Sequence, residues 1–266
     1  MDLNLLLLIM KPLIDLTAEQ IKKIKLISFD SDGVLAKKGT EIKQNSSGFY
    51  SQQTNLISPE VLDKLNILKK RFHIVINSGR NSLYLSQIYQ DILWDNITII
   101  SEIGVFLTGN GYLVQSEPVN DYELKAIINI RRELGKLIGD PRVEGFEPKQ
   151  FLTTLHCLSE VPEVNDIVKK NDPENKFYCW WNLEAYDINP VKFTKVNALK
   201  KLLELKKINS DEVITVGNGI NDRDSVTSQF INITTDPANL ITDDFFVESE
   251  DIGGLEIINH LLSLIS

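Results

Sequence analysis

The sequence has few of the residues that hold disulfide-rich domains or metal clusters together. It contains two cysteines, Cys157 and Cys179, three histidines and no Cys-x-x-Cys pair. Two thiols cannot build a disulfide framework or a zinc site, and so few cysteines are typical of a reducing compartment. We interpret both as small buried hydrophobic residues.

An excess of positive charge is also missing. The 28 Lys and Arg residues are outnumbered by 37 Asp and Glu residues, which gives a formal net charge of −9. An acidic surface repels nucleic acid and anionic lipid, so we expect neither nucleic acid nor a membrane as a partner. An anionic substrate would have to be attracted by a local positive site.

No apolar run is long enough to span a bilayer. The run over residues 3–10 follows Asp2 instead of basic residues, and no small-residue cleavage site follows it, so we do not expect a signal peptide. We predict an apolar helix that packs on the domain or forms a homo-oligomer contact, in a cytoplasmic protein. Residues 1–24 form this N-terminal extension, which ends in a helix whose capping box is Thr17 and Gln20.

Apolar periodicity predicts alternating strands and helices at both ends of the chain. Strands are expected at 25–29, 73–76, 97–100, 213–216 and 230–233, with helices that begin near Pro59 and Leu83 and others at 196–205 and 255–265. This alternation predicts an α/β fold, a parallel sheet with helices on both faces.

The order of elements changes in the middle of the chain. We expect a helix at 122–137, a strand at 151–158, a helix at 162–170 and strands at 176–181 and 184–188. We therefore predict a core domain made of residues 25–111 and 189–266, with an inserted α+β domain at 112–188.

Four short segments with polar side chains each follow a predicted strand or begin a predicted helix. They are Asp30-Ser31-Asp32-Gly33, Asn77-Ser78-Gly79-Arg80, Lys195, and Gly217-Asn218-Gly219-Ile220-Asn221-Asp222. Ligands of open α/β sheets bind beyond the carboxyl ends of the strands, where these segments would lie. Taken singly, each segment is also typical of a solvated loop, a helix cap or a surface lysine.

Three of these segments carry side chains that favour a binding or catalytic function. Asp30 and Asp32, two residues apart in an extended chain, could converge on one cation, and Ser78 with backbone N–H groups at a helix start could hold a phosphate. Lys195 at a helix N-terminus opposes the helix dipole, which is expected where a residue is kept for function.

In this order, the four segments resemble the four motifs of the haloacid dehalogenase superfamily. The resemblance implies a Rossmann-like core with a cap domain, in which Asp30 is the phosphoryl-accepting nucleophile and Asp32 the general acid and base. It also implies that Lys195 offsets transition-state charge. By the same resemblance the phosphoryl group would be bound by Ser78, Gly79 and Asn221, and Mg²⁺ by Asp30, Asp32, Asn218 and Asp222.

The fourth motif departs from the family pattern. The family commonly reads Gly-Asp-x-x-Asn-Asp, whereas this chain has Asn218 at the first acidic position. An amide offers a metal ion an oxygen but no negative charge, so metal affinity is expected to be weaker or Asp222 to be a direct ligand. We expect Asp224 to be an exposed helix residue.

Most of the extra chain lies between Ser78 and Lys195, where it resembles the cap of Cof-like, sucrose-phosphate and mannosylphosphoglycerate phosphatases. Ser101-Glu102-Ile103-Gly104 is similar to a Glu-Asn-Gly segment of that group. The resemblance implies a phosphatase that acts on a small phosphomonoester, a sugar phosphate or a phosphoglycerate-type compound. Candidate specificity residues are Arg80, Lys149, Thr153, Thr154 and His156, although polar residues on a strand face and a structural histidine explain the last four equally well.

Two other functions remain open from the sequence. A phosphomutase of the phosphomannomutase type would use the same Asp30 and Asp32 and return the phosphoryl group to another hydroxyl. A catalytically impaired protein that binds a phosphorylated metabolite is favoured only by Asn218.

Overall fold

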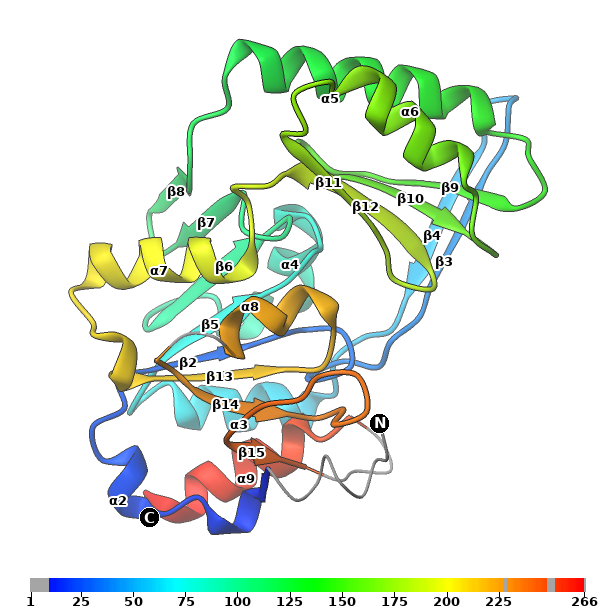
Figure 1. Cartoon of the computed structure of the whole chain (residues 1–266). Helices are drawn as coiled ribbons and strands as arrows, with labels where there is room; N and C mark the ends of the chain where they lie inside the picture. The colour runs from blue at the N-terminus through cyan, green and yellow to red at the C-terminus, as the bar shows by residue number, and fades with distance from the viewer. Residues whose placement is uncertain (1–9, 227–228, 248–251, 266) are drawn as a thin grey trace. The chain divides into compact units, whose positions relative to one another are not determined.

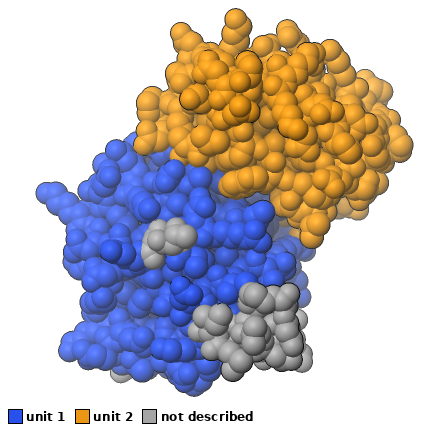
Figure 2. All heavy atoms as spheres, in the orientation of Figure 1, with its two compact units in different colours: residues 1–38, 55–116, 194–266 blue, residues 39–54, 117–193 orange. Residues whose placement is uncertain are grey.

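The computed structural model describes residues 10–226, 229–247 and 252–265, and the chain divides into two compact units. Unit 1 comprises residues 1–38, 55–116 and 194–266, and unit 2 comprises residues 39–54 and 117–193 (Figure 2). The predicted N-terminal apolar helix, with its oligomer contact, falls on residues 1–9 and thus outside the described residues, apart from Met10.

Unit 1 is built on a sheet of nine strands within the described residues (Figure 1). Their order is β1 (Lys11–Pro12), β15 (Phe245–Phe246), β14 (Ile231–Thr234), β13 (Val213–Gly217), β2 (Leu26–Phe29), β5 (His73–Asn77), β6 (Ile97–Ser101), β7 (Phe106–Gly109) and β8 (Tyr112–Gln115). Pairing is parallel from β1 to β6, which confirms the predicted parallel sheet. The antiparallel strands β7 and β8 were not predicted.

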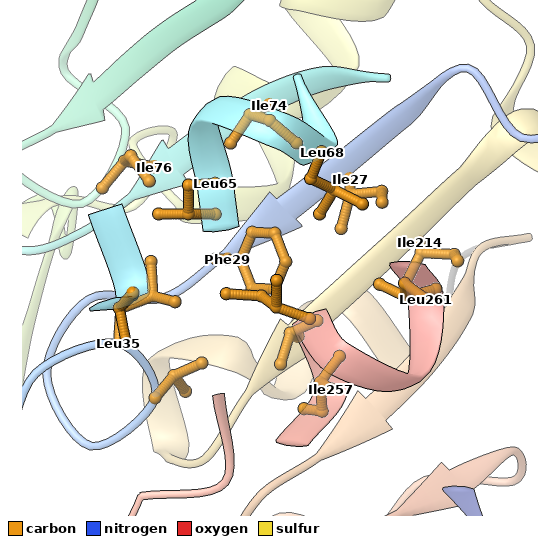
Figure 3. Close-up of a cluster of buried hydrophobic side chains, with 14 of the residues drawn as sticks. Ile27, Phe29, Leu35, Leu65, Leu68, Ile74, Ile76, Ile214, Ile257 and Leu261 are labelled. Atoms are coloured by element: carbon orange, nitrogen blue, oxygen red, sulfur yellow. The ribbon is translucent and has the colours of Figure 1, made fainter. Parts of the chain in front are cut away.

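Helices cover both faces of this sheet. They are α2 (Ala18–Ile21), α3 (Pro59–Leu68), α4 (Ser82–Ile88), α7 (Lys195–Lys206), α8 (Arg223–Val226) and α9 (Gly254–Leu264). Strand β2 shows why both faces must be covered: Ile27 and Phe29 lie in the core with α3 and α9 (Figure 3), whereas Leu26 lies in the core with α7. A central parallel strand is buried on both faces, so its sequence reads as a continuous apolar run.

The starts of the helices follow the cap signals in the sequence. Ser58 accepts a hydrogen bond from Val61 N, with Pro59 in the first helical turn of α3. Thr17 and Gln20 form the expected capping box of α2. These contacts satisfy backbone N–H groups that have no partner inside a helix.

Unit 2 contains a four-stranded antiparallel sheet in the order β11 (Phe177–Trp181), β12 (Ala185–Pro190), β10 (Thr153–Cys157) and β9 (Val143–Glu147). Helices α5 (Asp121–Leu134) and α6 (Glu163–Asn171) pack on it around Leu155, Tyr186 and Ile188. The hairpin β3 (Thr40–Gln44) and β4 (Tyr50–Thr54) belongs to the same unit, and Gln44 Oε1 accepts a hydrogen bond from Phe146 N at 2.9 Å. Over the residues described in the two units, no helix is both long and apolar enough to cross a membrane.

His73 at the start of β5 gives the fold a predictable response to acid. Its Nε2 lies 2.9 Å from Thr98 Oγ1, and burial, with the positive charge of Lys206, lowers the pKa of His73 to about 3. The unfolded chain binds this proton below pH ~6.5 and the folded chain does not, so stability falls as the pH falls from about 6.5 toward 3. In urea denaturation from pH 7 to 4, we expect the wild type to lose about 3 kcal/mol more than His73→Gln. Parallel losses in the two proteins would contradict the buried neutral histidine.

Candidate active site

Asp30 directly follows β2 and is buried at the carboxyl end of the sheet. The residue is 6% exposed. Its backbone N–H donates to Val216 O of the neighbouring strand at 2.9 Å. Asp30 Oδ1 accepts a hydrogen bond from Ser31 N at 2.7 Å and lies 2.8 Å from Lys195 Nζ. The strand pairing therefore fixes where this carboxylate lies.

Lys195 is the first residue of α7 and connects two carboxylates. Its Nζ lies 2.8 Å from Asp30 Oδ1 and 2.9 Å from Asp222 Oδ1, and the residue is 4% exposed. The helix begins there because Thr194 Oγ1 accepts a hydrogen bond from Asn197 N. The two carboxylates explain why a buried lysine is tolerated at a helix N-terminus, since they offset the unfavourable dipole and desolvation.

The charges in this cluster act on each other strongly. Burial raises the pKa of Asp30 to about 7, although the positive charge of Lys195 lowers it. The negative charge of Asp222 adds to the rise. Burial alone would lower the pKa of Lys195, but the charges and hydrogen bonds of Asp222 and Asp30 raise it above its usual range. Lys195 is therefore a permanent cation next to a carboxylate that is costly to ionise.

Asp32 is held by Arg80 in a bidentate ion pair. Arg80 Nε lies 3.0 Å from Asp32 Oδ2, and Arg80 Nη2 lies 2.9 Å from Asp32 Oδ1. The turn that brings Asp32 here requires Gly33, whose φ is 81° and where a Cβ would collide with the side chain of Asn218. Each carboxylate oxygen of Asp32 thus accepts a hydrogen bond from Arg80.

The Ser78 segment packs against a strained turn. Ser78 is buried, and its Oγ accepts a hydrogen bond from Arg80 N at 3.2 Å. Glu102, Ile103 and Gly104 all have positive φ, and Ile103 N donates to Ser78 O at 3.1 Å. A β-branched residue in this conformation is rare and strained. Gly79 lies between Ser78 and Arg80, with Ile103 as its neighbour.

The fourth segment faces the same cluster. Asp222 Oδ2 accepts hydrogen bonds from Asn218 N at 3.0 Å and Gly219 N at 3.2 Å, so the turn itself orients Asp222 toward Lys195. Asn218 Nδ2 donates to the backbone oxygen of Asp32 at 2.9 Å. Asn221 lies in the 3₁₀ turn Ile220–Asp222 and lines a small cavity beside Asp30, whereas Asp224 is exposed.

The donor set of this cluster suits a hard cation. It offers the carboxylates of Asp30 and Asp222, the amide of Asn218 and the backbone oxygen of Asp32, all within one hydrogen-bonded group. Over residues 10–226, 229–247 and 252–265, no three His, Cys, Asp or Glu side chains come together as a metal site. Mg²⁺ is compatible with this set because it retains several waters and needs only one or two protein carboxylates.

Three of the four predicted specificity residues of unit 2 share one buried polar group. Lys149 Nζ lies 2.7 Å from Thr154 Oγ1 and 3.2 Å from Glu147 Oε2, and His156 Nε2 lies 3.4 Å from the same Glu147 oxygen. Thr153 points instead toward α5, where its Oγ1 accepts a hydrogen bond from Arg131 Nε at 2.8 Å. Adjacent strand residues face opposite sides of a sheet, which separates Thr153 from Thr154.

This polar group also contains two acidic residues that were not predicted as site residues, Glu147 and Asp187. Thr154 Oγ1 donates to Asp187 Oδ1 at 2.6 Å, and Thr154 is paired in register with both acidic residues. Alternation along β9 and β12 could have placed them on one face, but only with the strand order known. Trp180 stacks on Tyr178 with ring centroids 3.8 Å apart, and Trp181 packs against Tyr186 in the core of unit 2.

Comparisons with known proteins find one family match over part of the chain and several solved structures with the same fold. Residues 142–224 match the family described as haloacid dehalogenase-like hydrolase. A trehalose-6-phosphate phosphatase related protein has the same fold, with a TM-score of 0.67 and 15% identity over 91% of this chain and 99% of that one. The C. albicans trehalose-6-phosphate phosphatase C-terminal domain is also similar, with a TM-score of 0.65 and 16% identity over 93% of this chain and 95% of that chain.

A third similar structure is the IMP-bound Plasmodium falciparum IMP-nucleotidase, with a TM-score of 0.58 and 14% identity over 94% of this chain and 71% of that chain. A sequence search of curated proteins finds no match. At these identities the structures share a fold with this chain, and the substrates in their names belong to them alone.

Proposed function

We propose that this chain is a haloacid dehalogenase-like hydrolase that hydrolyses a sugar phosphate through a phosphoryl group carried on Asp30; the family match over residues 142–224 and the shared fold support this proposal. The observation that carries the proposal is the Asp30–Lys195–Asp222 cluster, in which a buried carboxylate at a strand end is held by a permanent cation. Lys195 can offset negative charge on a transferring phosphoryl group.

The reaction proceeds in two displacements. Asp30 attacks phosphorus, the bond to the sugar oxygen breaks, and the leaving alkoxide takes a proton from Asp32. Water then attacks the aspartyl-phosphate, Asp32 takes up the proton of that water, and inorganic phosphate leaves with Asp30 restored. Arg80, which donates to both oxygens of Asp32, lies close enough to the proposed proton donor to contact the substrate phosphate as well if it shifts from Asp32.

We propose that Mg²⁺ is held by Asp30, Asp222, the amide oxygen of Asn218 and the backbone oxygen of Asp32. Bound there, the ion would neutralise charge on the phosphoryl oxygens. Ser78, Gly79 and Asn221 would bind the same oxygens through a hydroxyl, a backbone N–H and an amide. In unit 2, the polar group around Lys149, which includes Thr154 and His156, would select the leaving sugar by hydrogen bonds to its hydroxyls.

The experiment that tests this function is phosphate release from a panel of phosphomonoesters with and without Mg²⁺. The panel contains trehalose 6-phosphate, glucose 6-phosphate, mannose 6-phosphate, 3-phosphoglycerate, IMP and p-nitrophenyl phosphate. We expect Mg²⁺-dependent release, fastest with a sugar phosphate. An isomerised sugar phosphate without free phosphate would identify a mutase instead, and release that is fastest with IMP would overturn the sugar-phosphate class.

Asn218 should limit the affinity for the metal. Asn218→Asp adds a negative charge beside the proposed ion and removes the N–H donor that occupies Asp32 O. Because affinity for a hard cation rises with the number of charged ligands, we expect Mg²⁺ to bind roughly tenfold more tightly. Calorimetric titration of the two proteins measures this without substrate. The control is Asp224→Asn, whose affinity for Mg²⁺ should equal that of the wild type. If Asn218→Asp binds Mg²⁺ no more tightly than the wild type, the ion is bound elsewhere.

A further inference from the structure

The α7 side of the sheet changes from apolar to polar toward the carboxyl ends of the strands. Leu26, Val75 and Val213 lie in the apolar core beneath α7. Two residues further along each of these strands are Ser28, Asn77 and Thr215, and all three are buried. Thr215 Oγ1 donates to Asn232 Oδ1 at 2.7 Å. A polar layer at this depth is costly unless its groups are hydrogen-bonded.

Asn77 is the member of this layer that reaches Lys195. Its Nδ2 donates to the backbone oxygen of Lys195 at 3.1 Å, while its Oδ1 is buried without a hydrogen-bond donor among the residues that the structure describes. The residue as a whole is 5% exposed. A buried amide oxygen left unpaired destabilises a fold, so the environment of Asn77 points to a donor that is not part of the chain.

A cavity of suitable size lies beside Asn77. It is lined by Ser28, Asp30, Asn77, Lys195, Asp222 and Thr215, among others, and the space at its centre that is open to a water-sized sphere is about 20 Å³. One water needs roughly 10–15 Å³ by the same measure and two to four polar partners. The cavity meets both conditions.

We propose that this cavity binds one ordered water that donates to Asn77 Oδ1, and that Asn77 is a positioning residue for Lys195. The water donates its other proton to the Asp30 carboxylate and accepts hydrogen bonds from the Ser28 hydroxyl and the Lys195 ammonium, all of which line the cavity. Asn77 then holds the first residue of α7 from two sides, directly through its backbone oxygen and through the water behind its ammonium group.

This inference rests on the proposed function only for its kinetic consequence. Lys195 offsets charge that develops in the transition state, so a small displacement of its ammonium group lowers kcat more than it raises KM. The position of the water can be tested whether or not the chain turns over a phosphomonoester. Failure of the water site and failure of the enzymatic function are therefore separate results.

The test compares the wild type with Asn77→Leu, which has a similar volume and neither donor nor acceptor, and with Val75→Ala as a matched packing change on the same face of β5. A crystal structure of the wild-type chain at about 1.5 Å resolution is expected to show a water at 2.7–3.2 Å from Asn77 Oδ1. We expect the Asn77→Leu structure to lack this water. Its kcat should fall about tenfold while KM changes less than about twofold. It should bind orthovanadate about tenfold more weakly than the wild type and inorganic phosphate equally well. Val75→Ala is expected to lower the melting temperature without lowering kcat or weakening the binding of orthovanadate.

Two results would overturn the proposal. One is a wild-type structure with no water within hydrogen-bond distance of Asn77 Oδ1. The other is an Asn77→Leu chain that is as stable as the wild type and retains its kcat and its orthovanadate affinity, because an apolar side chain would then fill the cavity without loss. If Asn77→Leu does not fold, Asn77→Ser, which shortens the side chain without adding charge, is expected to fold and to lower kcat with KM changed less than about twofold; an unchanged kcat in that variant would overturn the positioning role.

Discussion

Asp30→Asn is expected to abolish phosphate release, with a loss of at least about 10⁴-fold in kcat for every substrate of the wild type. The amide has the shape of the carboxylate but cannot form an acyl phosphate, and no second carboxylate is held at the end of β2 in its place. Asp32 points to Arg80 and Asp222 is oriented by the N–H groups of Asn218 and Gly219. Release of inorganic phosphate, followed over hours at high enzyme concentration, measures the loss.

The control for this variant is Asp224→Asn, which makes the same change at an exposed carboxylate close to the cluster in sequence. It should leave kcat and KM within about twofold of the wild type. An Asp30→Asn chain that retains more than a few per cent of the activity would mean that water attacks the substrate directly, with Asp30 in a supporting role.

Lys195→Met is expected to have the second-largest effect, on both stability and rate. It leaves Asp30 and Asp222 buried without their shared cation, and breaking a buried ion pair from one side costs about 3–5 kcal/mol. Loss of the charge on the phosphoryl oxygens should lower kcat by a further ~10²–10³-fold. Urea denaturation at pH 8, with and without Mg²⁺, measures the stability, and Mg²⁺ should restore part of it because the ion supplies positive charge to the same carboxylates.

Lys201→Met on the same helix is the matched control, since Lys201 is half-exposed and pairs only with Glu204 in the described structure. Surface ion pairs contribute ~1 kcal/mol or less, so this variant should be nearly as stable as the wild type. The double variant Lys195→Met/Asp222→Asn should regain part of the stability lost in Lys195→Met, because it removes one of the two uncompensated charges. Equal stability of Lys195→Met and Lys201→Met would contradict the buried cluster.

The sequence predicts the catalytic half of the molecule well because its signals are local. Leu26–Phe29 and Val213–Gly217 are apolar runs that end at polar turns, and parallel strands bring their carboxyl ends to one edge. Thr194 as a cap places Lys195 at the start of α7. From these signals alone, Asp30, Lys195 and Asp222 are expected at one edge, and the structure joins them within 3 Å.

The hairpin Thr40–Gln44 and Tyr50–Thr54 could not be predicted in the same way. Its strands are mostly polar, Ile42 is their only buried side chain, and its support comes from unit 2 residues more than a hundred positions away, such as Phe146. The alternation that identifies a half-buried strand is therefore too weak to read. The positive φ of Ile103 could not be predicted for a related reason. A tertiary hydrogen bond to Ser78 O accompanies a backbone conformation that a β-branched residue does not favour by itself.

The hydrogen bonds between side chains within the site could not be predicted from the sequence either. Arg80 was expected to contact the substrate, and in this structure it holds Asp32. Asn218 was expected to offer oxygen to a metal ion, and its Nδ2 donates to Asp32 O. Such choices depend on distances of a few ångströms between chain segments that are far apart in the sequence, and no residue pattern encodes them.

The central claim is that the phosphoryl group passes through Asp30, and one measurement tests it directly. The wild-type chain is mixed with its best substrate and Mg²⁺, quenched in acid within the first turnover, digested and analysed by mass spectrometry. We predict one phosphoryl group on Asp30 in the peptide that spans β2 and its turn, absent from Asp30→Asn and lost on hydroxylamine treatment. Full turnover with no phosphoryl group on Asp30 at any quench time, or a phosphoryl group on another residue, would contradict the claim.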